Sequence, residues 1–262
     1  MTNKCESAKV RNALYQAVVE AGHYARTSWS RHRSVDSKSP KDLVTHIDKT
    51  NERRIREAVR RADPAVGFYG EETGGDSSSS RFVIVDPLDA TTNYILGLKL
   101  YSVMAALIEY MRLQYSVITL PEFDEVYVAS LGDGATMNNR KIQVSSVDRL
   151  SKATISCNRS NYPDDLMPKG LELIQRLMLN ALSWRNFGTA GVEYAWVASG
   201  KLDGIITPLA EPVHAAGYLL MQEAGAKVTD HLGNPITLES KTVVAANPRL
   251  HEQLLELVRG VF

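Results

Sequence analysis

Two aspartates come directly after a short apolar segment of the sequence. Residues Phe82–Val85 are continuously apolar and predict a buried strand, and Asp86-Pro87-Leu88-Asp89 follows it. Pro87 stiffens the exit from the strand, and the turn brings Asp89 back toward Asp86. Two carboxylates held close together repel each other unless a cation or a proton lies between them. Mg²⁺ takes one or two carboxylates with waters and substrate phosphate, so this pair favours a magnesium site.

A second pair of acidic residues lies shortly before that strand. Gly70-Glu71-Glu72-Thr73 places two acids after a glycine turn, and alone it favours a surface loop. Asp-x-x-Asp is equally common in turns. Two acidic pairs that flank one apolar strand are a much less common pattern than either pair alone. Thr91-Thr92-Asn93 would begin the next helix, whose free backbone N–H groups suit a phosphate.

The segments before this strand are predicted to be mainly helical. Residues 6–28 carry apolar side chains at helical spacing and predict an amphipathic helix. Residues 30–42 are polar and predict a loop. Asp48 is a candidate N-cap of a basic helix that ends near Asp63-Pro64. The basic residues of that helix are typical of a solvated helix face.

Strands dominate the middle of the chain and alternate with helices after it. Residues 101–109, 114–120 and 125–129 favour strands. The second half predicts strands at 153–157, 182–187, 203–206 and 242–246 and helices at 164–180, 188–199, 213–224 and 248–260. Such alternation implies strands layered with helices. The change of pattern divides the chain into an N-terminal α+β half, 1–145, with the candidate metal site, and a C-terminal α/β half, 146–262.

Composition argues against several other classes of protein. Thirty Lys and Arg balance thirty Asp and Glu in 262 residues, which gives no electrostatic case for binding nucleic acid or an anionic membrane surface. No apolar run approaches the roughly 18–20 residues that a membrane span needs. Cys5 and Cys157 form neither a disulfide framework nor a thiolate metal site. We therefore expect a soluble, cytoplasmic protein.

Five segments match, in order along the chain, the motifs of one enzyme family. They are Asp42–Asp48, Gly70–Glu72 with Asp86–Tyr94, Gly134–Ser145, Arg185–Ala190 and Ala215–Gly225. Through them nearly the whole chain resembles the inositol monophosphatase family of Mg²⁺-dependent, lithium-sensitive phosphatases. The resemblance implies an alternating αβαβα layered sandwich of the inositol monophosphatase/fructose-bisphosphatase type. It also implies a site between the two halves and a homodimer.

The resemblance implies a role for each matching residue. The metal ligands would be Glu71, Asp86, the Leu88 carbonyl and, for a second ion, Asp89. Glu71 and Thr91 would orient the attacking water, and Asp48 would support Thr91. The substrate-binding residues would be Ala90, Thr91, Thr92, Arg185, Gly188, Thr189, Glu211 and His214.

Two departures from the family's motifs affect this site. The family has Gly after the second Asp, whereas Ala90 adds a methyl group, which interferes if this backbone needs a positive φ or must approach phosphate closely. The family's late helix begins with Trp-Asp, and that Asp ligates the second metal. Pro212 and Val213 hold these positions here, and valine cannot bind a metal. The neighbouring alternatives are Glu211 and His214, although imidazole suits Zn²⁺ or Mn²⁺ better than Mg²⁺.

These observations leave two hypotheses about function. The first is a Mg²⁺-dependent phosphomonoesterase that hydrolyses a small phosphorylated polyol or sugar, with its first metal site intact. The second is a diverged member with an impaired second metal site, which binds a phosphorylated ligand or catalyses another reaction. The family's substrate-contacting acid falls near Ile206 or Thr207, and neither is acidic. The first hypothesis is favoured because every residue implied for the first metal is present.

Overall fold

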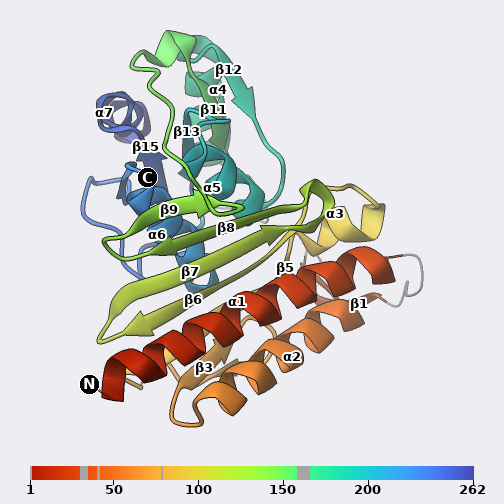
Figure 1. Ribbon diagram of the computed structural model, residues 1–262. Coiled ribbons are helices and arrows are strands. Elements are labelled where there is room, and N and C mark those ends of the chain that lie inside the picture. Colours follow the sequence, from red (N-terminus) through yellow and green to blue (C-terminus); the bar gives the residue numbers. More distant parts are fainter. Residues whose placement is uncertain (1, 30–34, 40–41, 78, 158–165) are drawn as a thin grey trace.

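Layers of helix and sheet alternate through the molecule (Figure 1). The computed structural model describes residues 2–29, 35–39, 42–77, 79–157 and 166–262. In layer order, the longer helices are α1 (Thr2–Ser28) and α2 (His46–Ala62), then α5 (Ala190–Ala198) and α6 (Ala215–Glu223), then α4 (Met167–Asn180) and α7 (Pro248–Val258). One sheet lies between the first two pairs, and another between the last two. The predicted αβαβα sandwich is therefore confirmed.

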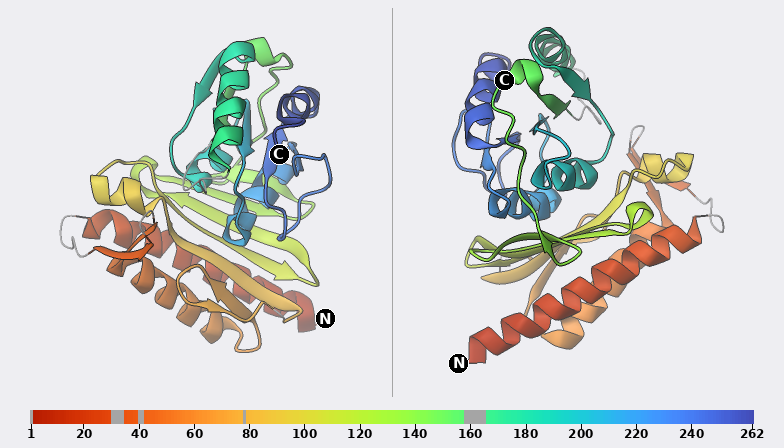
Figure 2. Two further views of the ribbon diagram at one scale, coloured as in Figure 1. Left: turned by 180° about the vertical axis from the view of Figure 1, so that it is seen from behind. Right: turned by 45° about the horizontal axis from the view of Figure 1, so that its top comes forward.

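The larger sheet has eight strands in the described part of the chain, in the order β10-β9-β8-β7-β6-β5-β3-β4. Their bounds are β3 Gly67–Gly70, β4 Gly74–Gly75, β5 Arg81–Asp89, β6 Ser102–Glu109, β7 Arg112–Leu120, β8 Glu125–Ser130, β9 Gly134–Met137 and β10 Arg140–Lys141. Neighbouring strands are antiparallel except β3 and β5, which are parallel. The first two helices cover one face of this sheet and the five-stranded sheet lies beyond the other (Figure 2).

Strand β5 is buried on both faces, as its continuous apolar run predicts. Val83 and Val85 pack against α1 and α2, whereas Phe82 and Ile84 pack against α5 and α6. Successive side chains of a strand point to opposite faces, so a strand between two helical layers needs apolar residues at every position. This burial delivers the end of β5 into the interior of the protein.

The second sheet, within the described residues, has the order β12-β11-β13-β15-β14. Its strands are β11 Thr154–Cys157, β12 Ser183–Arg185, β13 Gly204–Thr207, β14 Lys227–Thr229 and β15 Val243–Ala246. Helices α5 and α6 pack between the two sheets, and their apolar side chains form one core with both inner faces. The first sheet draws on residues 67–141 and the second on 154–246, and the division at 145/146 stays a prediction.

Several sequence-based boundaries are wrong in detail. The predicted loop at 30–42 contains β1 (Val35–Ser39), which pairs with β2 (Asp42–Thr45); its residues 30–34 and 40–41 lie outside the described residues. Asp48 is not the N-cap of α2, because Thr45 holds that position and accepts a hydrogen bond from the Ile47 N–H at 3.1 Å. Helix α4 is described only from Met167.

Two further elements differ from the prediction. The helix expected at 213–224 begins as a separate 3₁₀ turn, η3 (Pro212–His214), before α6. Strand β14 was not predicted, because its three residues are too few to show a pattern. Within the described residues, no helix is both long and apolar enough to cross a membrane.

Candidate metal and active site

The end of β5 presents two buried aspartates. Asp86 is 3% exposed and Asp89 is 8% exposed. Pairing between β5 and β6 shifts register between these two residues, so the strand ladder is interrupted at Pro87 and Leu88. Asn51 of α2 donates to the freed Pro87 carbonyl at 3.0 Å. The turn at the end of the strand is therefore held by a hydrogen bond from a side chain of α2.

Asp86 and Glu71 form a close pair of carboxyl groups. The Glu71 N–H donates to the Val85 carbonyl at 3.1 Å, which holds the loop after β3 (Gly67–Gly70) beside the end of β5. Burial raises the pKa of Asp86 well above its ordinary value, and the charges of Glu71 and Asp89 and a hydrogen bond with Glu71 act in the same direction. Such a pair is relieved by a shared proton or by a cation.

The donor set at this pair fits a magnesium ion. The Leu88 carbonyl offers a further oxygen on the same turn, 3.1 Å from the Thr91 hydroxyl oxygen. Two carboxylates and a carbonyl leave room for water and phosphate, which is how Mg²⁺ is usually bound. Among the described residues, no three His, Cys, Asp or Glu side chains form a ready-made metal cage. Water and substrate would therefore complete the coordination.

The fold brings Asp48 and Thr91 together, and the roles that the resemblance implied for them stay predictions. The Thr91 hydroxyl lies 2.9 Å from Asp48 Oδ1. Asp48 Oδ2 accepts from the Thr45 N–H at 2.8 Å and the Thr45 hydroxyl at 2.5 Å. Burial raises the pKa of Asp48, and these hydrogen bonds from Thr45 and Thr91 oppose the rise. With its proton directed to Asp48, Thr91 Oγ1 presents lone pairs that can accept a hydrogen bond from water.

Glu52 is a buried acid near the site that the sequence analysis missed. It is 1% exposed, accepts from the Glu72 N–H at 2.7 Å and from the Thr73 hydroxyl, and pairs with Arg56 at 3.1 Å. A Cβ at Gly70 would overlap its carboxylate. Glu52 therefore fixes the loop that carries Glu71. Its spacing of four residues after Asp48, on one helix face, is the signal that could have found it.

Ala90 has a positive φ at the position where the family has glycine. Its φ is 68° and its ψ is 51°, which is the left-handed region. A side chain costs about 1–2 kcal/mol there relative to an ordinary conformation, and glycine avoids that cost. The turn between β5 and α3 (Thr91–Leu96) is therefore strained where the family has Gly.

We expect Ala90→Gly to raise the free energy of unfolding by about 0.5–1 kcal/mol, because relief of strain exceeds the added chain entropy. The melting temperature should rise by about 1–4 °C. Ala181→Gly is the matched control: Ala181 has an ordinary φ of −89°, so that substitution should lower the melting temperature. A decrease for Ala90→Gly would contradict the strain.

The side-chain carboxylate of Asp89, the last residue of β5, lies at the N-terminus of α5. Oδ1 accepts from the Ala190 N–H at 3.0 Å. Oδ2 accepts from the Gly191 N–H at 2.9 Å, the Ser102 hydroxyl at 2.9 Å and the Thr189 hydroxyl. Thr189 is also the N-cap of α5. Asp89 thereby joins the end of β5 to a helix about a hundred residues away in the sequence.

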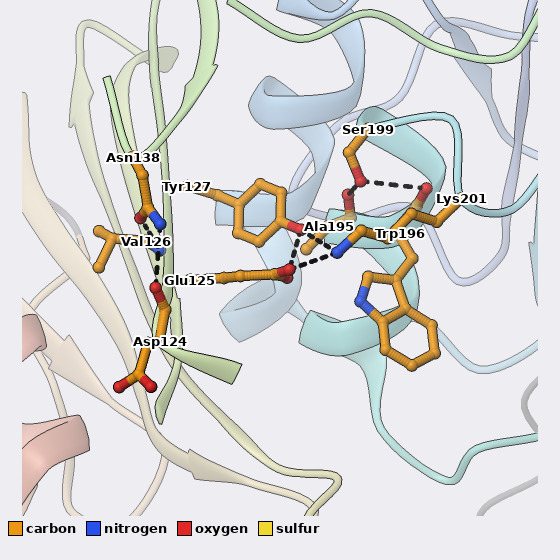
Figure 3. A network of polar contacts seen from close by, with 9 residues as sticks. All are labelled: Asp124, Glu125, Val126, Tyr127, Asn138, Ala195, Trp196, Ser199 and Lys201. Carbon is orange, nitrogen blue, oxygen red and sulfur yellow. Dashed lines mark hydrogen bonds and ion pairs between the residues drawn. The ribbon is translucent and has the colours of Figure 1, made fainter. Parts of the chain in front are cut away.

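The other end of α5 is attached to β8 by a polar network (Figure 3). The Tyr127 hydroxyl donates to Glu125 Oε2 at 2.7 Å, and Lys201 Nζ pairs with Glu125 Oε1 at 2.5 Å. The same ammonium group lies 5.9 Å from the centre of the Trp196 ring. Helix α5 is therefore fixed to the large sheet at both ends, which fixes the donors around Asp89.

Glu193 is a second buried acid that the sequence analysis missed. Its side chain is inaccessible to solvent and accepts from the Phe187 N–H at 2.9 Å. Burial raises the pKa of Glu193 to about 8; hydrogen bonds from Phe187, Ser156 and Gly188 oppose the rise, and the charge of Asp89 adds to it. The signal was a lone charge in an otherwise apolar helix, Ala190–Ala198.

The late helix supplies no carboxylate to the site. Val213 is 4% exposed and belongs to the core between the sheets. His214 Nδ1 accepts from the Glu211 N–H at 3.3 Å, and its ring packs edge-on against Tyr194. Burial lowers the pKa of His214, which favours the neutral ring. Glu211 is exposed, and its side chain accepts from the backbone of its own turn.

The other implied substrate residues lie in different surroundings. Thr92 is exposed beside Thr91. Arg185 is exposed and donates to the Trp184 carbonyl at 2.8 Å, so its guanidinium makes its contacts on its own strand. Gly188 has a φ of 68° in the loop before α5, next to Asn93. Thr207 is buried, and its hydroxyl accepts a hydrogen bond from the Tyr194 hydroxyl at 3.2 Å. It lies near the position where the family has a substrate-contacting acid.

The layered αβαβα fold is that of solved inositol monophosphatase structures. The sequence profile of the inositol monophosphatase family matches residues 6–261, and the chain belongs to this family. Its members and structural neighbours include phosphatases of small phosphorylated compounds.

Individual relatives carry two kinds of name. The chain is 34% identical to Inositol-1-monophosphatase of Rhizobium meliloti over 95% of both chains. It is 35% identical to Putative Nus factor SuhB of Neisseria meningitidis over 85% of this chain and 87% of that protein. The extragenic suppressor protein suhB from Bartonella henselae superposes with a TM-score of 0.90 at 31% identity, covering 95% and 98% of the two chains.

Proposed function

We propose that this protein is a Mg²⁺-dependent phosphomonoesterase that hydrolyses a small phosphorylated polyol or sugar. The observation that carries the proposal is the close pair of Glu71 and Asp86, with the Leu88 carbonyl and an oriented Thr91 hydroxyl on the adjoining turn. Family membership supports the reaction class. A cytoplasmic location and a homodimer are part of the same proposal; exposed Leu171, Met178 and Leu179 on α4 support the homodimer.

The proposed roles follow from the contacts of each side chain. Glu71, Asp86 and the Leu88 carbonyl hold the cation, which would polarise the phosphate ester and lower the pKa of a bound water. Thr91 Oγ1 accepts one hydrogen of the attacking water because Asp48 takes its own proton. The carboxylate of Glu71 accepts the other hydrogen. Backbone N–H groups that follow Ala90 face the phosphate.

The direct test is phosphate release from a panel of sugar and polyol phosphates, with Mg²⁺ and with EDTA. We expect release only with Mg²⁺, and a loss of about 10²-fold or more in kcat for Thr91→Val, which keeps the shape and removes the hydroxyl. Exposed Thr237→Val, in the segment between β14 and β15, is the control and should change kcat by much less. No release from any substrate by folded, metal-bound protein would overturn the proposal.

The burial of Val213 supports a second candidate. In that reading the protein binds a phosphorylated ligand, or catalyses a different reaction, without ordinary phosphatase activity. Val213 lies in the core, and Thr207 is committed to Tyr194. If the wild type is inactive and Val213→Asp gains Mg²⁺-dependent turnover, the second candidate is supported. Efficient turnover by the wild type would exclude it.

A further inference from the structure

The charge of Asp89 is stabilised by four hydrogen bonds from the protein itself. Three donors meet at Oδ2, which is more than its two in-plane lone pairs would ordinarily serve, and a fourth meets Oδ1. Two of the four are the first N–H groups of α5, where the helix dipole favours an anion. A carboxylate with this many partners has little to gain from a cation.

This donor cluster is built into the packing of the two neighbouring elements. Ser102 lies opposite Asp89 in the pairing of β5 with β6, and its side chain is inaccessible to solvent. A Cβ at Gly191 would overlap the Ser102 hydroxyl. The absence of a side chain at 191 therefore makes room for the serine donor, so Ser102 and Gly191 act as a pair.

The late helix offers nothing that would bring a second cation to Asp89. Val213 presents hydrocarbon. His214 accepts a hydrogen bond at Nδ1, and a neutral imidazole that accepts at one nitrogen carries its hydrogen on the other, so neither nitrogen has a free lone pair. The Glu211 side chain caps its own turn. The residues present thus do not fit the second metal that the resemblance implied.

We propose that this protein binds one divalent cation per chain, at Glu71 and Asp86, and that Asp89 anchors α5 instead of ligating a second ion. Ser102, Thr189 and the first N–H groups of α5 stabilise the carboxylate by hydrogen bonds in place of a second cation. The first cation rests on the function proposed above; the assignment of Asp89 rests on its own contacts. Asp89 then positions the loop before α5 against the turn that carries Thr91.

The test counts ions by titrating Mn²⁺ against the metal-free full chain, with free Mn²⁺ followed by electron paramagnetic resonance. We expect about one ion per chain for the wild type. Asp89→Asn should still bind about one ion with less than about a threefold change in Kd, and its melting temperature should fall by about 3–8 °C because the anchor loses its charge. Asp86→Asn should bind none at the same concentration. Exposed Asp133→Asn is the matched control and should change neither quantity.

Two ions on the wild type, or none, would overturn the proposal. Loss of the ion from folded Asp89→Asn would overturn the assignment of Asp89. If that variant does not fold, the wild-type stoichiometry decides alone. The outcomes separate this proposal from the proposed function: one ion without phosphate release contradicts only the function, and release with two ions contradicts only the single site.

Discussion

Asp86→Asn is expected to abolish Mg²⁺-dependent phosphate release, with a loss of about 10³-fold or more in kcat/KM. Asp86 is buried at the end of β5 and lies against Glu71, and these two carboxylates are the acids proposed to hold the cation. An amide keeps the shape but is a weaker magnesium ligand and carries no charge. Loss of a metal-stabilised transition state costs several kcal/mol, which corresponds to a thousandfold or more in rate.

The same substitution should stabilise the metal-free protein at neutral pH. The pKa of Asp86 is raised in the folded state from an ordinary value of 3.8, so the folded protein holds a proton that the unfolded chain releases. Stability from this group is therefore present at low pH and declines as pH rises above about 4. Asparagine removes that decline. An activity loss accompanied by higher metal-free stability distinguishes a metal ligand from a structural residue.

The measurement pairs initial rates of phosphate release with urea unfolding in EDTA at pH 5 and pH 7.5. Asp133→Asn is the control for both, because Asp133 is exposed in the turn between β8 and β9. Asp86→Asn should lose activity and show a smaller fall in stability between the two pH values than the wild type. Activity within tenfold of the wild type would contradict the role of Asp86 as a metal ligand.

The sequence predicted the local part of the site well. A continuous apolar run followed by Asp-Pro-Leu-Asp specified a doubly buried strand and the turn at its end, because burial on both faces requires that pattern. A helix start at Asp48 was predicted, whereas the N-cap is Thr45. Thr and Asp are both favoured at the N-cap, and in this capping box Asp48 is the third helical residue, so residue type alone does not separate the two positions.

Long-range partners could not be predicted in the same way. Asp89 meets Thr189, Ala190 and Gly191, and the pairing depends on how α5 packs between two sheets. Two nearby carboxylates repel, so the sequence alone favours a metal beside Asp89. The hydrogen-bond donors that the fold brings to Asp89 from α5 and β6 are not visible in the sequence. The loss of Asp at Val213 was visible in the sequence, but only the packing shows hydrocarbon and a committed imidazole beside it.

Glu193→Gln is expected to change the pH dependence of stability more than any other substitution of a residue outside the metal site. The pKa of Glu193 rises from an ordinary 4.5 to about 8 because the side chain is buried. Between these values the unfolded chain has lost the proton and the folded protein retains it. The wild type should therefore lose about 1.4 kcal/mol of stability per pH unit from this group. Glutamine cannot ionise, so the variant lacks that loss.

Glutamine can also keep the main contact of Glu193, because its side-chain oxygen can accept from the Phe187 N–H. Urea unfolding of metal-free protein at pH 5.5 and pH 7.5 checks the prediction. The advantage of Glu193→Gln over the wild type should grow by about 2 kcal/mol across that interval. Exposed Glu252→Gln should show no such growth. A constant difference would mean that Glu193 is already ionised in the folded protein. The loop before α5 would then be held by a charged acceptor, and the hydrogen bond from the Phe187 N–H would be correspondingly stronger.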